Sequence, residues 1–86
     1  MWHMLGEIAY DFKSYEEFEN ARWERFRENV KHIMRKQGVN QTDLSRLSDI
    51  STSTVSSWIR GEKTPRSYHV DAIASALRVS PFDLFE

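Results

Sequence analysis

Helix-start signals recur at short intervals along this sequence, and they limit what 86 residues can fold into. A small polar residue of the kind that caps helices stands before each apolar-periodic run. These residues are Ser14, Asn40, Ser51, Ser67 and Ser80. The three glycines and two prolines are too few for the turns of an all-β protein of this length. The sequence therefore predicts an all-α chain with five helical segments.

The longest run predicts a helix that begins near Tyr15, after the capping pair Ser14 and Glu17. It ends at Gly38, which suits the left-handed position that closes many helices. Its mostly apolar positions recur in steps of three and four residues: Phe18, Arg22, Phe26, Val30, Ile33 and Gln37. The pattern fits one helix of about 23 residues and equally fits two helices with a bend.

Three shorter helices and a final turn are expected after Gly38. The inward positions are Leu44 and Leu47 in the first helix, Val55, Trp58 and Ile59 in the second, and Val70, Ile73, Ala74 and Leu77 in the third. Ser80 and Pro81 open the final turn, with serine at the N-cap and proline at the first helical position. These apolar positions form the predicted core.

The net charge of −1 averages over two unlike parts of the chain. Residues 1–29 hold four Lys and Arg against seven Asp and Glu, whereas residues 31–66 hold seven against three. Attraction of an acidic partner depends on local positive potential, so we expect such a partner at the basic window of residues 31–66.

The composition argues against several classes of protein. No apolar run is long enough to span a membrane and no signal-peptide pattern opens the chain, so we expect a cytoplasmic protein. Cysteine is absent, and His3, His32 and His69 lack the spacing of metal ligands. A nucleophile elbow and a glycine-rich phosphate loop are also missing. We therefore expect no enzymatic activity, no metal and no cofactor.

Two short helices separated by three or four residues, over 41–48 and 52–60, form a helix-turn-helix pattern. In such a unit the second helix lies in the major groove of DNA while the first crosses the backbone. The outward positions expected on the second helix are Thr52, Ser53, Thr54, Ser56, Ser57 and Arg60. Short hydroxyl side chains let a helix approach base edges closely.

The stretch NQTDLSRLSDISTSTVSSWIRGEKTPR, continued by IASALRVSPFDLF, resembles the lambda-repressor/Cro type of helix-turn-helix DNA-binding domain. The resemblance covers about residues 26–86 and implies a five-helix, lambda-repressor-like fold, with residues 1–25 as an N-terminal extension. It implies base reading by Thr52, Ser53 and Ser57. It also implies phosphate contacts by Gln41, Ser51, Arg60, Lys63 and Arg66.

The sequence departs from the family pattern at three positions. Ser45 replaces the usual alanine of the helix contact, and Asp49 replaces the usual glycine of the turn. Aspartate tolerates a left-handed conformation better than most residues, so the turn is still expected. Glu62 stands where lysine is common, and a carboxylate near phosphate is unfavourable.

The extension is unusually apolar for a chain end. Its large apolar side chains include Trp2, Met4, Leu5, Ile8, Tyr10, Phe12, Tyr15 and Phe18. An exposed set of this size usually covers another surface. It packs on its own domain, contacts a second copy of the chain, or docks another protein, and the sequence does not separate these alternatives.

Together these features favour a sequence-specific regulator of transcription that binds double-stranded DNA. We expect a repressor that binds an inverted repeat as a homodimer. One alternative is the antitoxin of a toxin–antitoxin pair, whose extension masks the toxin while the helix-turn-helix autoregulates the operon. Another is a protein-interaction module that has lost DNA binding, which Glu62 and the low net charge would support.

Overall fold

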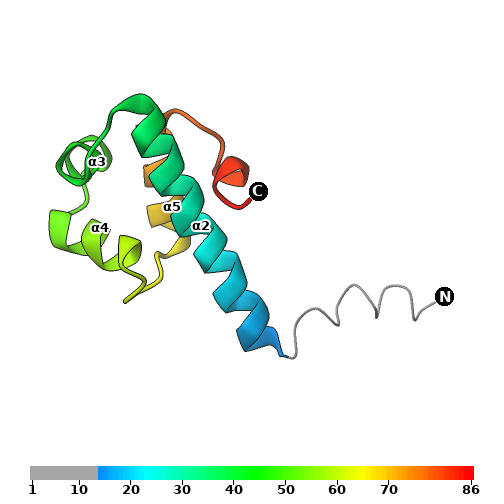
Figure 1. Cartoon of the computed structure of the whole chain (residues 1–86). Coiled ribbons are helices and arrows are strands. Elements are labelled where there is room, and N and C mark those ends of the chain that lie inside the picture. The colour runs from blue at the N-terminus through cyan, green and yellow to red at the C-terminus, as the bar shows by residue number, and fades with distance from the viewer. Residues whose placement is uncertain (1–13) are drawn as a thin grey trace.

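The described part of the chain folds into a series of helices, much as the sequence indicates (Figure 1). The computed structural model describes residues 14–86. It contains α2 (Tyr15–Gln37), α3 (Gln41–Ser48), α4 (Thr52–Ile59) and α5 (Ser67–Leu77), followed by the 3-10 turn η1 (Pro81–Leu84). Over this range the all-α prediction is confirmed, but the α-helices number four and not five. The expected fifth helix is the four-residue η1, too short for a ladder of α-helical hydrogen bonds.

Helix α2 is one continuous helix of 23 residues, which decides between the two alternatives left open by the sequence. The Ser14 hydroxyl accepts the Glu17 backbone N–H at 3.1 Å, and Gly38 ends the helix in a left-handed conformation with φ 71°. Figure 1 shows the first turns of α2 extending past the other helices. The domain boundary predicted between residues 25 and 26 lies inside this helix and stays a prediction.

The turn between α3 and α4 takes the form that the capping residues predict. Asn40 and Asp43 form a reciprocal capping box at the start of α3, and the Ser51 hydroxyl accepts the Thr54 N–H at the start of α4. Asp49 is left-handed with φ 60°, as expected of the residue that replaces glycine. The Ser45 hydroxyl donates to the Ile50 carbonyl, so the residue that replaces alanine ties α3 to the turn.

Two local predictions are wrong. Leu47, expected to face inward, is 54% exposed, because Leu44 alone carries the buried side of the short helix α3. Ser67 is the first residue of α5 and not its cap. The cap position belongs to Arg66, whose backbone N–H donates to His69 Nδ1 at 3.3 Å.

Every element contributes to a single apolar core. The buried apolar side chains are Phe26, Val30, Met34, Leu44, Val55, Trp58, Val70, Ile73, Ala74, Leu77 and Leu84. Ile59, expected to be inward, packs against this set while remaining partly exposed. Val55 and Trp58 of α4 and the four predicted positions of α5 are therefore confirmed as core, whereas Ile59 lies at its edge. The apolar side chains predicted to cover a surface from residues 1–13 lie outside the described residues.

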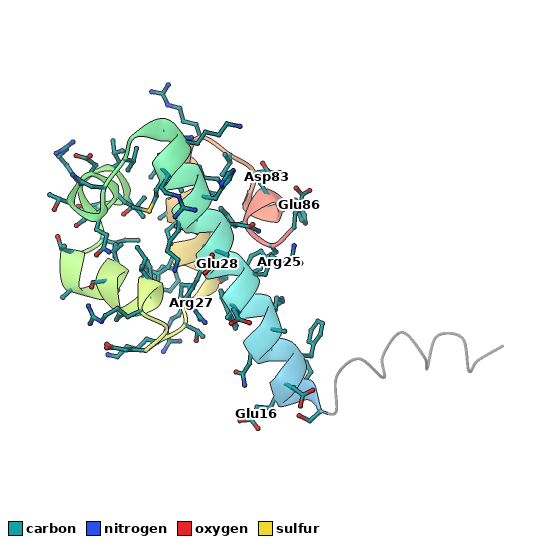
Figure 2. The ribbon with its side chains drawn as sticks, viewed as in Figure 1. Glu16, Arg25, Arg27, Glu28, Asp83 and Glu86 are labelled. Atoms are coloured by element: carbon teal, nitrogen blue, oxygen red, sulfur yellow. The ribbon has the colours of Figure 1, made fainter. Side chains whose placement is uncertain are left out.

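The C-terminal turn is held against α2 by side-chain hydrogen bonds to backbone carbonyls. Asn29 Nδ2 donates to the carbonyls of Leu84 and Glu86, both at 3.1 Å, and Arg25 Nη1 also donates to Glu86. Figure 2 shows Arg25 beside this C-terminal segment, whereas Arg27 points toward the loop that follows α4. Helix α2 therefore separates the side of the molecule that carries η1 from the side that carries α4.

We expect Leu84→Ala to lower the free energy of unfolding by about 2–5 kcal/mol, because it removes a fully buried side chain from a packed core. Leu84 is 0% exposed, whereas Phe82, two residues earlier in the same turn, is 81% exposed. Phe82→Ala is the matched control and should change stability by less than about 0.5 kcal/mol. Urea unfolding followed by circular dichroism measures both. Equal losses in the two variants would contradict the assigned core.

Candidate nucleic-acid interface

The outward face of α4 is polar and made of short side chains at its start. Thr52 and Ser53 are exposed, Thr54 and Ser56 are half-buried, and Arg60 is exposed directly after the helix ends. The apolar positions Val55 and Trp58 face the core, so the helix presents its hydroxyl groups away from the protein. This is the surface expected of a helix that lies in the major groove.

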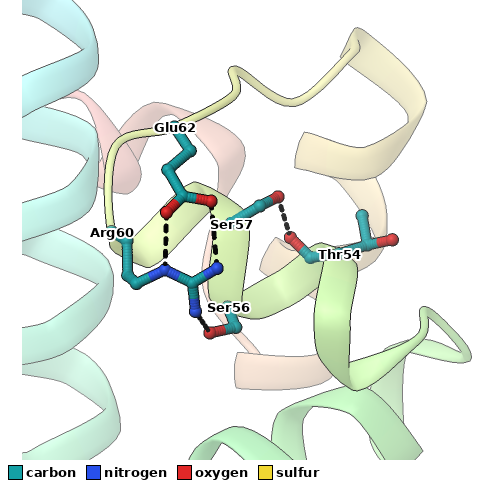
Figure 3. Close-up of polar contacts among 5 residues, drawn as sticks. All are labelled: Thr54, Ser56, Ser57, Arg60 and Glu62. Atoms are coloured by element: carbon teal, nitrogen blue, oxygen red, sulfur yellow. Dashed lines mark hydrogen bonds and ion pairs between the residues drawn. The ribbon is translucent and has the colours of Figure 1, made fainter.

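Ser57 does not belong to this face. Its side chain is 7% exposed, and its hydroxyl donates to the Thr54 carbonyl at 2.7 Å (Figure 3). Its own carbonyl accepts the backbone N–H of Glu62 at 2.8 Å. The burial of this hydroxyl and its bond within the helix argue against the base-reading role that the family pattern implies for Ser57, and that role stays a prediction. Thr52 and Ser53 remain the predicted base-reading residues.

Ser51 acts first as a structural cap. Its hydroxyl accepts the Thr54 N–H at 3.3 Å and donates to Thr54 Oγ1 at 2.7 Å. The phosphate contact predicted for Ser51 stays a prediction, and any such contact would use a hydroxyl already committed to the helix start. The exposed backbone at this helix start carries the positive end of the helix dipole, which itself attracts an anion.

The end of α4 carries a cluster of Arg60, Glu62 and Ser56 (Figure 3). Arg60 Nε donates to Glu62 Oε2 and Arg60 Nη2 to Glu62 Oε1, both at 2.9 Å, and Arg60 Nη1 donates to the Ser56 hydroxyl. These hydrogen bonds, and then the charge of Arg60, hold the pKa of the Glu62 carboxyl below its ordinary value. Glu62 therefore faces Arg60 as a bidentate partner.

A basic hollow lies beside the start of α3. It is an open groove of about 280 Å³, lined by Lys31 and Arg35 from α2, by Gln41 at the start of α3, and by Ile59 from α4. Lys31 also pairs with Glu28 at 3.3 Å. The sequence placed Lys31 and Arg35 in its basic window but not in the site, because they join Gln41 in one groove only when α4 packs against both α2 and α3.

A second, larger hollow lies beside Thr54 and Trp58 of α4. It is an open hollow of about 550 Å³, lined by Thr54 and Trp58 of α4, by Glu62, Lys63 and Arg66 of the following loop, and by His69 of α5. Lys63 and Arg66 are exposed, and the His69 ring lies 4.9 Å from the Trp58 ring, centroid to centroid. Of the five predicted phosphate-binding residues, Gln41 lines the first hollow and Lys63 and Arg66 line the second, whereas Ser51 and Arg60 line neither of the two.

Within residues 14–86, no group of three or more His, Asp or Glu side chains is arranged to hold a metal ion. In the same part of the chain, no helix is both long and apolar enough to cross a membrane.

Comparison with known proteins agrees with this geometry. Residues 29–86 match the family model of the Cro/C1-type HTH DNA-binding domain, which confirms the resemblance seen in the sequence. Among curated proteins, none matches this sequence.

A solved structure shows a similar fold over most of the chain. It is the restriction-modification controller protein C.AhdI from Aeromonas hydrophila, with a TM-score of 0.71 and 26% sequence identity. The match covers 76% of this chain and 98% of C.AhdI, so nearly the whole of that protein has a counterpart here. The lambda-repressor-like fold is thus supported.

Ser57→Ala is expected to lower the free energy of unfolding by about 1 kcal/mol, because it removes a buried hydroxyl that donates to the Thr54 carbonyl. It should leave DNA sequence preference unchanged. Chemical unfolding and a binding comparison on matched and mismatched DNA measure the two effects. Loss of preference at one base pair would restore the base-reading role of Ser57.

The pairing of Arg60 with Glu62 predicts an acid-sensitive contact. Because the pKa of Glu62 is lowered, the pair is intact at neutral pH and is lost as the pH falls through that lowered value. An NMR titration of the Glu62 carboxyl should give a higher midpoint in Arg60→Ala than in the parent protein. The same midpoint in both proteins would show that the contact does not form in solution.

Proposed function

Because the chain belongs to the Cro/C1-type HTH DNA-binding domain family, we propose that it is a transcriptional repressor that binds an inverted-repeat operator as a homodimer. The family and the fold make it a DNA-binding transcriptional regulator. Repression, the homodimer and the operator symmetry are the finer parts of the proposal. We further propose that it acts by binding alone and not as an enzyme.

The observation that carries the proposal is that α4 borders two hollows, each of which is lined by two or more basic side chains. Lys31 and Arg35 border one hollow, and Lys63 and Arg66 border the other. A helix inserted in the major groove has a phosphate backbone on each side, and basic side chains there set its register. The exposed Thr52 and Ser53 would then meet base edges.

We propose a homodimer because a reading surface this small gains specificity when two copies bind one DNA site. One helix-turn-helix unit contacts one half-site, and two units related by a twofold axis contact a palindrome with half-sites about one DNA turn apart. The similarity to a restriction-modification controller protein favours a second candidate function, control of the genes of such a system.

The test is a binding titration on DNA selected by the protein from a random library, at two or more salt concentrations. A regulator should enrich one inverted repeat, and log affinity should fall against log salt by about 0.9 per phosphate contacted. Analytical ultracentrifugation with and without the selected DNA gives the stoichiometry. If no sequence is enriched at low salt, the proposed regulator function is wrong, and a protein-interaction module becomes the favoured function.

Charge-matched variants separate phosphate contacts from base contacts. Arg66→Ala should weaken selected and random DNA to the same extent and reduce the salt slope by about 1, whereas Ser53→Ala should lose about 1 kcal/mol of discrimination at one base pair. Arg25→Ala removes the same charge beside η1 and should change DNA affinity little. If Arg25→Ala and Arg66→Ala weaken binding equally, the effect is one of net charge and the assigned contacts are wrong.

A further inference from the structure

The outward face of α4 has a single long hydrogen-bond donor. With Ser57 buried, the other polar side chains of the helix are the short hydroxyls of Thr52, Ser53, Thr54 and Ser56. A hydroxyl donates or accepts with almost any base, so these groups discriminate weakly between base pairs. Arg60 is the one group on this face that could form the bidentate contact on which sharp base discrimination usually depends.

The Arg60 side chain lies back along the helix instead of extending beyond its end. Its Nη1 donates to the hydroxyl of Ser56, which stands one turn earlier (Figure 3). Helical side chains lean toward the N-terminus in this way. The guanidinium is therefore held beside the middle of α4, on the face that also carries Ser53, and not at the outer edge of the domain.

The donors of Arg60 are only partly used. A guanidinium carries five N–H groups, and here Nε, one N–H of Nη2 and one N–H of Nη1 are engaged by Glu62 and Ser56. One N–H remains on each terminal nitrogen. The guanidinium therefore keeps donors on both terminal nitrogens for the O6 and N7 acceptors of guanine in the major groove.

The carboxylate of Glu62 makes a base the better partner than a phosphate. A phosphate brought to this guanidinium would also approach the Glu62 charge, and the two anions repel. The edge of guanine is a neutral acceptor, so it can bond the remaining pair of donors without that cost. Glu62 would then keep the fork of Arg60 in one orientation, which lowers the entropy lost on binding.

We propose that Arg60 reads a guanine in each half-site, with Glu62 and Ser56 as the residues that position it. The proposal rests on the proposed DNA-binding function. It replaces the phosphate contact that the family pattern implies for Arg60, and it gives Glu62, which otherwise looks unfavourable near DNA, a role in recognition.

The experiment is selection from a randomised double-stranded library, read by sequencing, with the parent protein, R60A, R60K and E62Q. The parent should select a guanine at one position of each half-site by about 10–100-fold over other bases. In R60A this preference should fall to near unity while the other positions are kept. R60K keeps the charge without the fork, so affinity for random DNA should persist within about twofold while the guanine preference drops by about tenfold.

The variant E62Q separates positioning from simple repulsion. The substitution removes one negative charge, so affinity for random DNA should rise. It also weakens the hydrogen bonds that hold the Arg60 guanidinium, so the preference for guanine should fall about threefold or more. Opposite changes in the two quantities support the proposal. If E62Q raises affinity for all sequences and keeps the guanine preference, Glu62 merely repels DNA and its positioning role is excluded.

Two outcomes overturn the inference in different ways. If R60A selects the same sequence as the parent and only binds all DNA more weakly, Arg60 is a phosphate contact and the guanine reading is wrong, while the regulator stands. If the parent itself enriches no sequence at low salt, the DNA-reading function fails first. Thermal unfolding of each variant checks the fold, and these exposed positions should change stability by less than about 0.5 kcal/mol.

Discussion

The rotation of α4 about its own axis is set by the burial of Val55 and Trp58, and the candidate interface depends on it. Both side chains lie in the core with Leu44 of α3 and Phe26 of α2. A helix whose buried residues are fixed has no freedom in what it shows to solvent. Packing in the interior therefore decides that Ser53 and Arg60 face outward and that Ser57 does not.

The parts that could be predicted from the sequence are those determined by near neighbours. Caps such as Ser51 and Asn40, the left-handed Asp49 and the apolar spacing of α5 all follow from contacts within a few residues. Ser57 could not be assigned in this way, because a serine whose hydroxyl bonds a carbonyl of its own helix is satisfied whether buried or exposed.

Other features depend on contacts between distant segments. Lys31 and Gln41 line one groove with Ile59 because α4 packs against both α2 and α3, which no local pattern encodes. Capping residues of the same kind precede the α-helices and the 3-10 turn η1. Ser80 and Pro81 therefore do not indicate that η1 ends after four residues. The exposed Leu47 shows that the eight-residue helix α3 is too short for its pattern to define a buried stripe.

The continuity of α2 has a mechanical consequence. The family match begins at residue 29, and the same unbroken helix includes Tyr15–Glu28 before it, a length of about 21 Å, with Phe26 already part of the core. In an unbroken helix the number of residues fixes both the length and the rotation between its two ends. Adding or removing one residue would rotate the far end by about 100° about the helix axis. The length of this stretch, counted in residues, therefore sets the direction in which the far end of α2 points relative to the DNA-facing side of the molecule.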